Sequence, residues 1–292
     1  MTKSTGDTIL SEKAFLVKLT ISQWSAKTTD KAITAEIAKN HDTDEAIGKF
    51  HKNLIRSKSL DKFRKHAQMT RELHYAMTLP WSDGGMRMLP VMRYEEYQTE
   101  IRAAIDDGKD MVREFLEEYD ECVERSKKAE LKDLAKDYEF PSVDKIRSKF
   151  AIYTTQMPIP AQGGGWPSML REVEGELNNG YEKMVQSALQ SGEQELWVRI
   201  HRYVSRMHAR LSDPDQSFRR TLVSKLRDLV QDIPKMNIGN NADIASMIAD
   251  IEQRLVGEEF ETLRDEKDVR KQVADDAGEI LEKMAVFYTT PS

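Results

Sequence analysis

Residues 94–127, YEEYQTEIRAAIDDGKDMVREFLEEYDECVERSK, carry the longest helical pattern in the chain and decide its fold class. Apolar or small residues recur there at near-heptad spacing, at Tyr97, Ile101, Ala104, Gly108, Met111, Phe115 and Cys122. At about 1.5 Å per residue, such a helix is roughly 50 Å long. A helix of this length needs a partner along its apolar side, which is either another helix of this chain or a second subunit.

Upstream of that helix, the sequence predicts one strand and three helices. In the strand, over Phe15–Trp24, β-branched and other apolar residues alternate with polar ones. The helices are marked by apolar residues three or four positions apart, and they open near Thr28, Thr43 and Ser59. The run LPWSDGG at residues 79–85 predicts a turn between the third helix and the long one.

Downstream, a short helix capped by Ser142 leads into a second strand-like stretch, FAIYTTQM, at residues 150–157. We expect this stretch to pair with Phe15–Trp24 on the surface of the helices, because two strands alone are marginal. The run PIPAQGGGWP at residues 158–167 predicts a linker, since successive glycines disfavour regular structure. The chain therefore divides into a helical domain with a minor sheet (1–157), the linker and an all-helical domain (168–292).

The C-terminal domain is predicted to be a helical bundle. Five helices are expected. The first ends near Gly192 and the second covers Trp197–Leu211. The third opens at Asp213-Pro214 and ends at Ile233-Pro234, the fourth spans residues 244–255, and the last spans residues 268–288. The predicted fold class is mainly α, with long antiparallel helices, a minor two-stranded β element in the N-terminal half and a helical bundle in the C-terminal half. The apolar seam of Trp197–Leu211 is also a candidate surface for self-association.

The composition excludes several classes of protein. The 292 residues are 39% hydrophobic and 32% charged, with a formal net charge of −6, which suits elongated helices better than a compact α/β enzyme. No apolar run approaches the roughly 20 residues of a membrane helix, and the N-terminus lacks a signal-peptide pattern. A single cysteine forbids an internal disulfide and favours a reducing cytosol.

Motifs of catalysis and cofactor binding are missing from the sequence. It contains no GxxxxGK[ST], GxGxxG, HExxH, CxxC or GxSxG, and no EF-hand loop. Cys122 lies among acidic residues that disfavour a thiolate, so we expect a core position. His201 and His208 are seven residues apart, whereas helical zinc pairs are usually four apart. We therefore expect no enzyme, no cofactor and no metal site.

Charged residues are segregated along the chain. The segment from Lys49 to Arg71 contains eight basic residues and one acidic residue. The segment from Arg199 to Arg227 also contains eight basic residues. The stretch from Glu95 to Glu124 carries twelve acids. One interpretation is that the basic helices bind nucleic-acid phosphates. The other, which the negative net charge favours, is that basic helices lie beside acidic ones within or between subunits. The candidate binding residues in either case are Arg199, Arg202, Arg206, Arg210, Arg219 and Arg220.

The loop between Pro80 and Pro90 is a second candidate surface. Trp81, Asp83 and Arg87 lie in this glycine turn, which suits recognition of a partner. The alternative is that Trp81 is a plug that seats the loop on the helices. The sequence does not separate the two.

Several motifs occur in an order that resembles a known family. They are ISQWS (21–25), LPWSDGGMRMLP (79–90), Tyr94, Tyr97, FPS (140–142), KF (149–150) and PIP (158–160). Over about residues 12–165 the chain resembles an uncharacterised family of tailed bacteriophages and mobile elements, classed as a domain of unknown function. Phe140 and Met88 depart from the family pattern, which has tyrosine and leucine there; both changes are conservative.

The resemblance implies a phage or mobile-element protein that acts in the cytoplasm of an infected bacterium. It also implies genes nearby for a MoxR-type AAA+ ATPase and a von Willebrand A-type protein, and it supplies no catalytic residues. The function expected is therefore a non-enzymatic helical assembly protein that binds itself and a protein partner such as an AAA+ ATPase. The alternative is a nucleic-acid-binding protein of phage replication or recombination.

Overall fold

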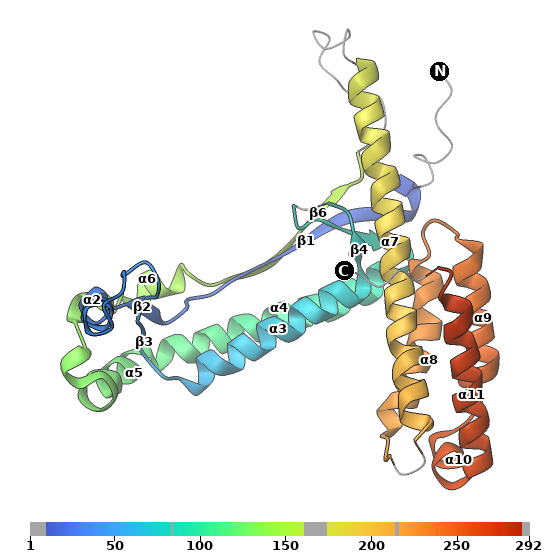
Figure 1. The fold of residues 1–292 in the computed structure, drawn as a ribbon. Coiled ribbons are helices and arrows are strands. Elements are labelled where there is room, and N and C mark those ends of the chain that lie inside the picture. Colours follow the sequence, from blue (N-terminus) through green and yellow to red (C-terminus); the bar gives the residue numbers. More distant parts are fainter. Residues whose placement is uncertain (1–9, 83, 161–173, 214–215, 288–292) are drawn as a thin grey trace. The chain divides into compact units, whose positions relative to one another are not determined.

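The computed structural model describes residues 10–82, 84–160, 174–213 and 216–287 (Figure 1). It is 68% helical, which confirms the mainly α class. Its α-helices are α2 (Lys31–Asn40), α3 (Lys58–Met77), α4 (Tyr94–Glu117), α5 (Tyr119–Arg125), α6 (Val143–Arg147), α7 (Glu174–Leu211), α8 (Arg220–Met236), α9 (Ala242–Leu255), α10 (Phe260–Asp265) and α11 (Lys267–Met284). Its strands are β1 (Ala14–Ser22), β2 (Lys27–Thr29), β3 (His51–Asn53), β4 (Leu79–Pro80), β5 (Arg87–Pro90) and β6 (Ala151–Pro158).

Two compact units make up the chain, and they are interleaved in sequence. Unit 1 consists of Met1–Lys18, Met77–Tyr97 and Gln156–Ser292, and unit 2 of Leu19–Ala76 and Gln98–Thr155. The predicted domains were contiguous, whereas β1, α3, α4 and β6 each run from one unit into the other. Most of the predicted linker, from residue 161 onward, lies outside the described residues.

The larger sheet has the strand order β4-β5-β1-β6. The predicted pairing of the first strand with the stretch at 150–157 is confirmed, because β1 and β6 are neighbours. The prediction of a two-stranded element is wrong, since β1 also pairs antiparallel with β5, placing Ala14 opposite Pro90. β4 and β5 form a hairpin; β4 lies inside the run predicted as a turn, β5 follows that run, and Gly85 between the strands has a φ of 76°. The sequence did not predict a strand at β4 because it contains Pro80. Proline is tolerated there because β4 is an edge strand.

Unit 2 supplies the partner of the long helix. The long helix is α4 followed by α5, with a break at Glu118. The imidazole Nε2 of His66 on α3 lies 2.6 Å from the carbonyl oxygen of Ala104 on α4. Lys62 and Glu114 form an ion pair of 3.0 Å between the same two helices. Within unit 2, α3 therefore packs on α4. The partner of the long helix is another helix of this chain, which is one of the two alternatives predicted.

The core of unit 2 is an aromatic cluster at the α5 end of α4. Trp24 packs against Phe115 and Tyr119, with ring centroids 6.4 and 5.8 Å apart. Phe150 contacts Phe115 at 5.7 Å. Cys122 is buried in the same cluster, which confirms the core position predicted for it.

The prediction of a helix that opens near Thr43 is wrong. Residues 41–50 form turns and loop, and residues 51–53 are β3, which pairs antiparallel with β2. Ile47, which the helix would have buried, is 76% exposed. The backbone of Phe50 makes two hydrogen bonds with the start of α2: its N–H donates to the side-chain Oγ1 of Thr34, and its carbonyl accepts from the Asp30 N–H. These tertiary bonds outweigh the local helical spacing.

The segment that follows α5 is irregular. It forms a π-helical turn η2 (Ser126–Leu131) and two 3-10 turns, η3 (Lys132–Leu134) and η4 (Asp137–Glu139). Lys132 adopts a φ of 47°, a conformation that ends any continuous helix. α6 then follows at the position predicted for the helix after Ser142.

Unit 1 is the predicted helical bundle, in which α7 packs on α8 and α11, and α9 packs on α8 and α11 (Figure 1). α7 is one continuous helix of 38 residues, although two were predicted with a break near Gly192. A Cβ at position 192 would lie 3.4 Å from Leu79 Cδ1 and 3.6 Å from Met88 Cε. Both distances are ordinary van der Waals contacts, so a Cβ would fit; the packing of α7 on other elements of unit 1 keeps the helix continuous through a residue of low helix propensity.

The apolar seam of α7 lies inside unit 1. Trp197, Ile200, Val204, Met207 and Leu211 are all buried in the bundle core. This corrects the expectation that the seam is available for self-association, because its side chains already contact other helices of the same unit.

α8 begins and ends later than predicted. It opens at Arg220 with Arg219 as its N-cap, and it runs through Pro234 to Met236. Pro214, the expected first residue of this helix, lies outside the described residues. Proline in the last turn removes one backbone hydrogen bond without ending the helix. α9 starts at Ala242, close to the predicted start at residue 244, and the Asn241 side chain caps it by accepting hydrogen bonds from the Asp243 and Ile244 N–H groups.

Candidate functional site

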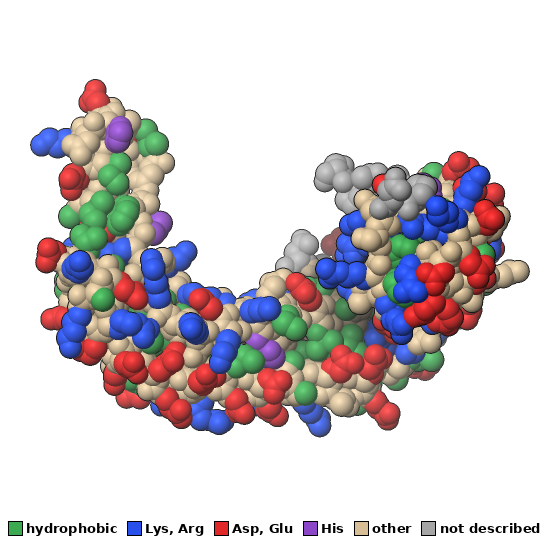
Figure 2. Space-filling model, turned by 90° about the horizontal axis from the view of Figure 1, so that it is seen from below, with side chains coloured by type: hydrophobic (Ala, Val, Ile, Leu, Met, Phe, Trp, Pro, Cys, Tyr) green, Lys and Arg blue, Asp and Glu red, His purple; other side chains and the backbone are tan. Residues whose placement is uncertain are grey.

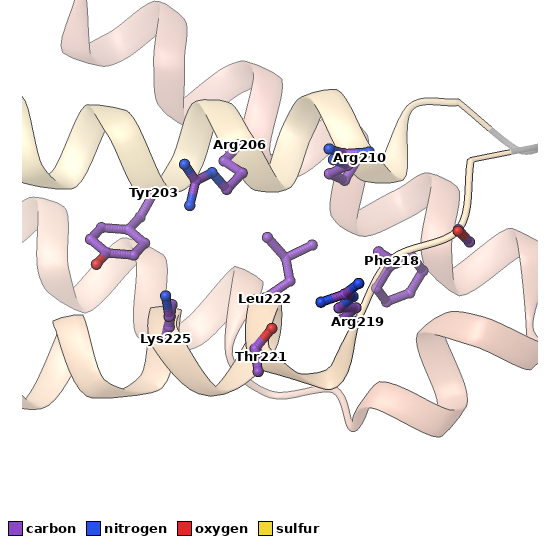
Figure 3. Close-up of a pocket in the computed structure, with 9 residues that line it drawn as sticks. Tyr203, Arg206, Arg210, Phe218, Arg219, Thr221, Leu222 and Lys225 are labelled. Atoms are coloured by element: carbon purple, nitrogen blue, oxygen red, sulfur yellow. The ribbon is translucent and has the colours of Figure 1, made fainter. Parts of the chain in front are cut away.

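A groove lies between α7 and α8 (Figure 3). Its volume is about 410 Å³. The groove is lined by Tyr203, Arg206 and Arg210 from α7 and by Ser217, Phe218, Arg219, Thr221, Leu222 and Lys225 from α8 and the segment before it. All of these residues belong to unit 1.

Four cations line this basic groove, and none of its nine lining residues is acidic. Figure 3 shows Arg206, Arg219 and Lys225 extending around the central side chain of Leu222. The ion pairs found among the described residues engage other cations of this region and none of Arg206, Arg210, Arg219 and Lys225. The N-terminus of α8, with its partial positive charge, opens at the same place. The groove is therefore built to attract an anion.

Three of the six predicted arginines, Arg206, Arg210 and Arg219, come together in the groove. Arg199 does not. Its guanidinium donates to the Thr78 carbonyl at 2.9 Å and forms an ion pair with Glu195. Burial lowers the pKa of Arg199, although it remains charged. Arg199 thus holds α7 to the start of the hairpin within unit 1.

Arg220 and Arg202 also lie outside the groove. Arg220 forms an ion pair with Glu261 and lies over the ring of Phe260 at 5.8 Å. Arg202 lies over the Tyr203 ring, with its guanidinium carbon 5.3 Å from the ring centroid. Arg202 therefore covers one side of an aromatic residue that lines the groove.

The sequence prediction missed Lys225 and the two hydroxyl residues Ser217 and Thr221. Lys225 was part of the basic segment between Arg199 and Arg227, but it does not belong to the arginine stripe, meaning Arg199, Arg202, Arg206 and Arg210, which are three or four residues apart on one helix. Its position is set by the packing of α8 on α7, which brings a second helix against that stripe. A single-helix pattern carries no signal for this, but the spacing of Thr221 and Lys225, one helical turn apart, places both on one face of α8.

Trp81 and Arg87, in the loop between Pro80 and Pro90, contact other residues of unit 1. Trp81 is 8% exposed and belongs to the unit's core. The Arg87 guanidinium donates to Thr78 Oγ1 at 2.7 Å and forms an ion pair with Glu195 at 3.0 Å. Asp83 lies outside the described residues. The positions of Trp81 and Arg87 match the plug alternative rather than the recognition loop.

The basic segment between Lys49 and Arg71 contains a buried ion cluster in unit 2. Lys52 Nζ lies 3.0 Å from Asp30 Oδ2 and 2.8 Å from Glu139 Oε2, and it donates to the Leu134 carbonyl at 2.6 Å. The Lys52 and Asp30 side chains are 2% and 3% exposed. The hydrogen bond from Lys52 lowers the pKa of Asp30. This cluster ties β3, α2 and η4 together.

Acidic and basic side chains lie next to one another over much of the face shown in Figure 2. The described residues contain no cluster of three or more His, Cys, Asp or Glu side chains that could hold a metal ion. None of the helices in the described ranges is long and apolar enough to cross a membrane. Burial raises the pKa of the Cys122 thiol, which disfavours a reactive thiolate.

Comparison with known protein families, curated proteins and solved structures finds no match to this chain. The family resemblance and its implied partners therefore stay predictions, and the groove is interpreted from its own chemistry.

Proposed function

We propose that this chain is a non-enzymatic binding protein whose basic groove binds the phosphates of a nucleic acid. The observation that supports this is the convergence of Arg206, Arg210, Arg219 and Lys225 without an acidic lining residue. Gathering four cations costs electrostatic free energy in the free protein, and a polyanion offsets that cost when it binds.

The shape of the groove agrees with a phosphate ligand. Guanidinium groups bind phosphate oxygens with paired hydrogen bonds, and hydroxyl groups such as those of Ser217 and Thr221 donate to the same oxygens. Cations come from both helical walls, so one anion can be held from two sides. An open groove of this kind accepts a chain of phosphates.

The first test is fluorescence anisotropy with labelled oligonucleotides, titrated from 50 to 200 mM salt. Four phosphate contacts predict a slope of about −3 for the logarithm of affinity against the logarithm of salt concentration. That slope corresponds to a loss of roughly 50-fold in affinity over this range. A flat salt dependence, or no binding at 50 mM salt, contradicts the proposal.

A charge-reversal pair locates the binding. Arg206→Glu combined with Arg219→Glu removes two groove cations and is expected to abolish measurable binding at 150 mM salt. The matched control is Lys267→Glu combined with Lys271→Glu on α11, where both side chains are exposed and the net charge change is identical. If both double variants lose affinity equally, net charge and not the groove controls binding.

A protein partner is a second candidate function, favoured by apolar side chains exposed at the start of α4. Val91, Met92 and Tyr94 are 48%, 77% and 40% exposed. Such a patch suits a contact with a second copy or another protein; an AAA+ ATPase is the concrete partner that the resemblance implies. Light scattering of the wild type and Met92→Asp tests self-association, because a polar side chain at this exposed position is expected to lower the mass only if the patch is an interface.

A further inference from the structure

The basic groove has an aromatic side chain at one end. Tyr203 lines it beside Arg206, and Figure 3 shows its ring at the opposite end from Phe218. Phe218 is engaged inside unit 1, since its ring contacts Phe260 at 5.4 Å and the Arg270 guanidinium at 5.1 Å. Tyr203 is half-buried and also packs against the bundle core, and the part of its ring that lines the groove is the aromatic surface offered to a ligand.

The setting of Tyr203 suits the stacking of a nucleic-acid base. Arg202 lies over the ring at 5.3 Å, so a base that reaches the groove-lining part of the ring would add to an existing guanidinium–phenol contact. Leu222 adds an apolar surface at the centre of the groove. Proteins that bind single strands combine such an aromatic platform with a positive groove for the backbone.

The aromatic side chain that lines the groove favours a single strand over a duplex. A duplex is a stiff rod whose bases face inward, and bringing one base onto Tyr203 requires unpairing at a cost of a few kcal/mol. A single strand pays no such cost and can turn its bases outward.

We propose that the basic groove binds single-stranded nucleic acid in preference to duplex, with the sugar–phosphate backbone along Arg206, Arg210 and Arg219 and one base stacked on Tyr203. This inference rests on the proposed function, because it assumes that the groove binds phosphates. It adds the strand type and a base contact that does not depend on charge.

The test measures anisotropy with a labelled 12-nucleotide thymidine strand, a duplex of equal length and an abasic strand with the same number of phosphates. The single strand is expected to bind at least about tenfold more tightly than the duplex at the same salt concentration. The abasic strand is expected to lose about as much affinity as the protein loses with Tyr203→Leu, at least about fivefold.

Variants at position 203 separate stacking from charge. Tyr203→Leu is expected to weaken single-strand binding while leaving the salt slope unchanged, because no phosphate contact is lost. Tyr203→Phe keeps the ring and is expected to bind like the wild type. Tyr138→Leu, at a tyrosine of unit 2 that is 82% exposed, is the matched control. Circular dichroism spectra verify that each variant is folded.

The outcomes distinguish the two proposals. Equal affinity for duplex and single strand, or an unchanged affinity in Tyr203→Leu, overturns the inference while phosphate binding by the groove stands. The absence of binding to every oligonucleotide at 50 mM salt contradicts the proposed function itself, and the inference with it.

Discussion

Lys52 and the basic groove are two places where this chain concentrates positive charge, and their surroundings differ. Lys52 in unit 2 is buried, and two carboxylates and a carbonyl oxygen surround its ammonium group. The groove in unit 1 is open, and four cations line it without an acidic residue. The basic segments from which they come have the same number of Lys and Arg residues, eight each.

The difference shows that the number of basic residues in a segment does not identify a binding site. A cation that the chain itself neutralises, as Asp30 and Glu139 neutralise Lys52, is part of the fold. Cations that gather without a counter-charge raise the free energy of the unliganded protein, and an external anion lowers it. Removing a charge should therefore destabilise unit 2 at Lys52 and leave the stability of unit 1 nearly unchanged at the groove.

The largest effect is expected for Lys52→Met. This change removes the ammonium that Asp30 and Glu139 share and leaves Asp30 only the more distant Lys136, at 3.8 Å; losing one member of a buried ion cluster costs about 3 kcal/mol. Urea unfolding should show a lower midpoint, and hydrogen exchange should show lost protection in α2 and β3. Lys65→Met, at an exposed position of α3, is the control and should stay near the wild type. Equal midpoints for both variants would mean that the cluster contributes little.

Acid should weaken the same cluster. The pKa of Asp30 is lowered by its hydrogen bond from Lys52, so the carboxylate contributes stability above its unfolded pKa of about 3.9. That contribution is lost as the pH falls through the lower folded pKa. Burial opposes the charge of Lys52, but its bonds to Glu139 and Asp30 raise its pKa, so its own contribution is lost only above about pH 10.

Unfolding midpoints measured from pH 6 down to pH 3 check this dependence. The decline should be steeper in the wild type than in Lys52→Met, which no longer has the ion pair to lose. Parallel declines in the two proteins would assign the acid sensitivity to other carboxylates.

The smallest effect is expected from neutral substitutions in the groove. Arg206→Met and Arg219→Met remove exposed cations from a cluster of like charges, so the free energy of unfolding should stay within about 0.5 kcal/mol of the wild type. A slight gain in stability is the expected sign, because like-charge repulsion falls. Thermal unfolding at low salt measures it, and a loss of more than about 1 kcal/mol would show that these arginines are structural.

The sequence predicted those elements whose burial pattern is local. Alternation marked β1, a Thr-Thr-Asp start marked α2, and periodic apolar residues marked α3, α4 and α9. The prediction failed where tertiary contacts decide the backbone. At Phe50 the hydrogen bonds to Asp30 and Thr34 override helical spacing, and Gly192, which looked like a helix end, lies inside the continuous helix α7 packed within unit 1.

Only part of the groove was predicted, because the sequence pattern of one helix does not show which residues of another helix pack against it. Arg206 and Arg210 lie one turn apart on one helix, so a single periodic pattern identifies them. Arg199 fits that pattern equally well, yet Glu195 and the Thr78 carbonyl occupy its guanidinium. Lys225 fits no stripe of α7, because its place in the groove depends on how α8 packs. Local spacing identifies the face of a helix but not what lies opposite it.

The interleaving of the two units has a consequence for the order in which the chain acquires structure on the ribosome. Unit 2 ends at Thr155, so all of its residues have been synthesised before most of unit 1 exists. Ala14–Lys18 and the β4–β5 hairpin leave the ribosome early, but the helices α7, α8, α9 and α11, which contribute most of the core that these segments share, are made last. Unit 2 can therefore fold during translation, whereas these early segments of unit 1 wait with apolar side chains uncovered until the C-terminal helices emerge.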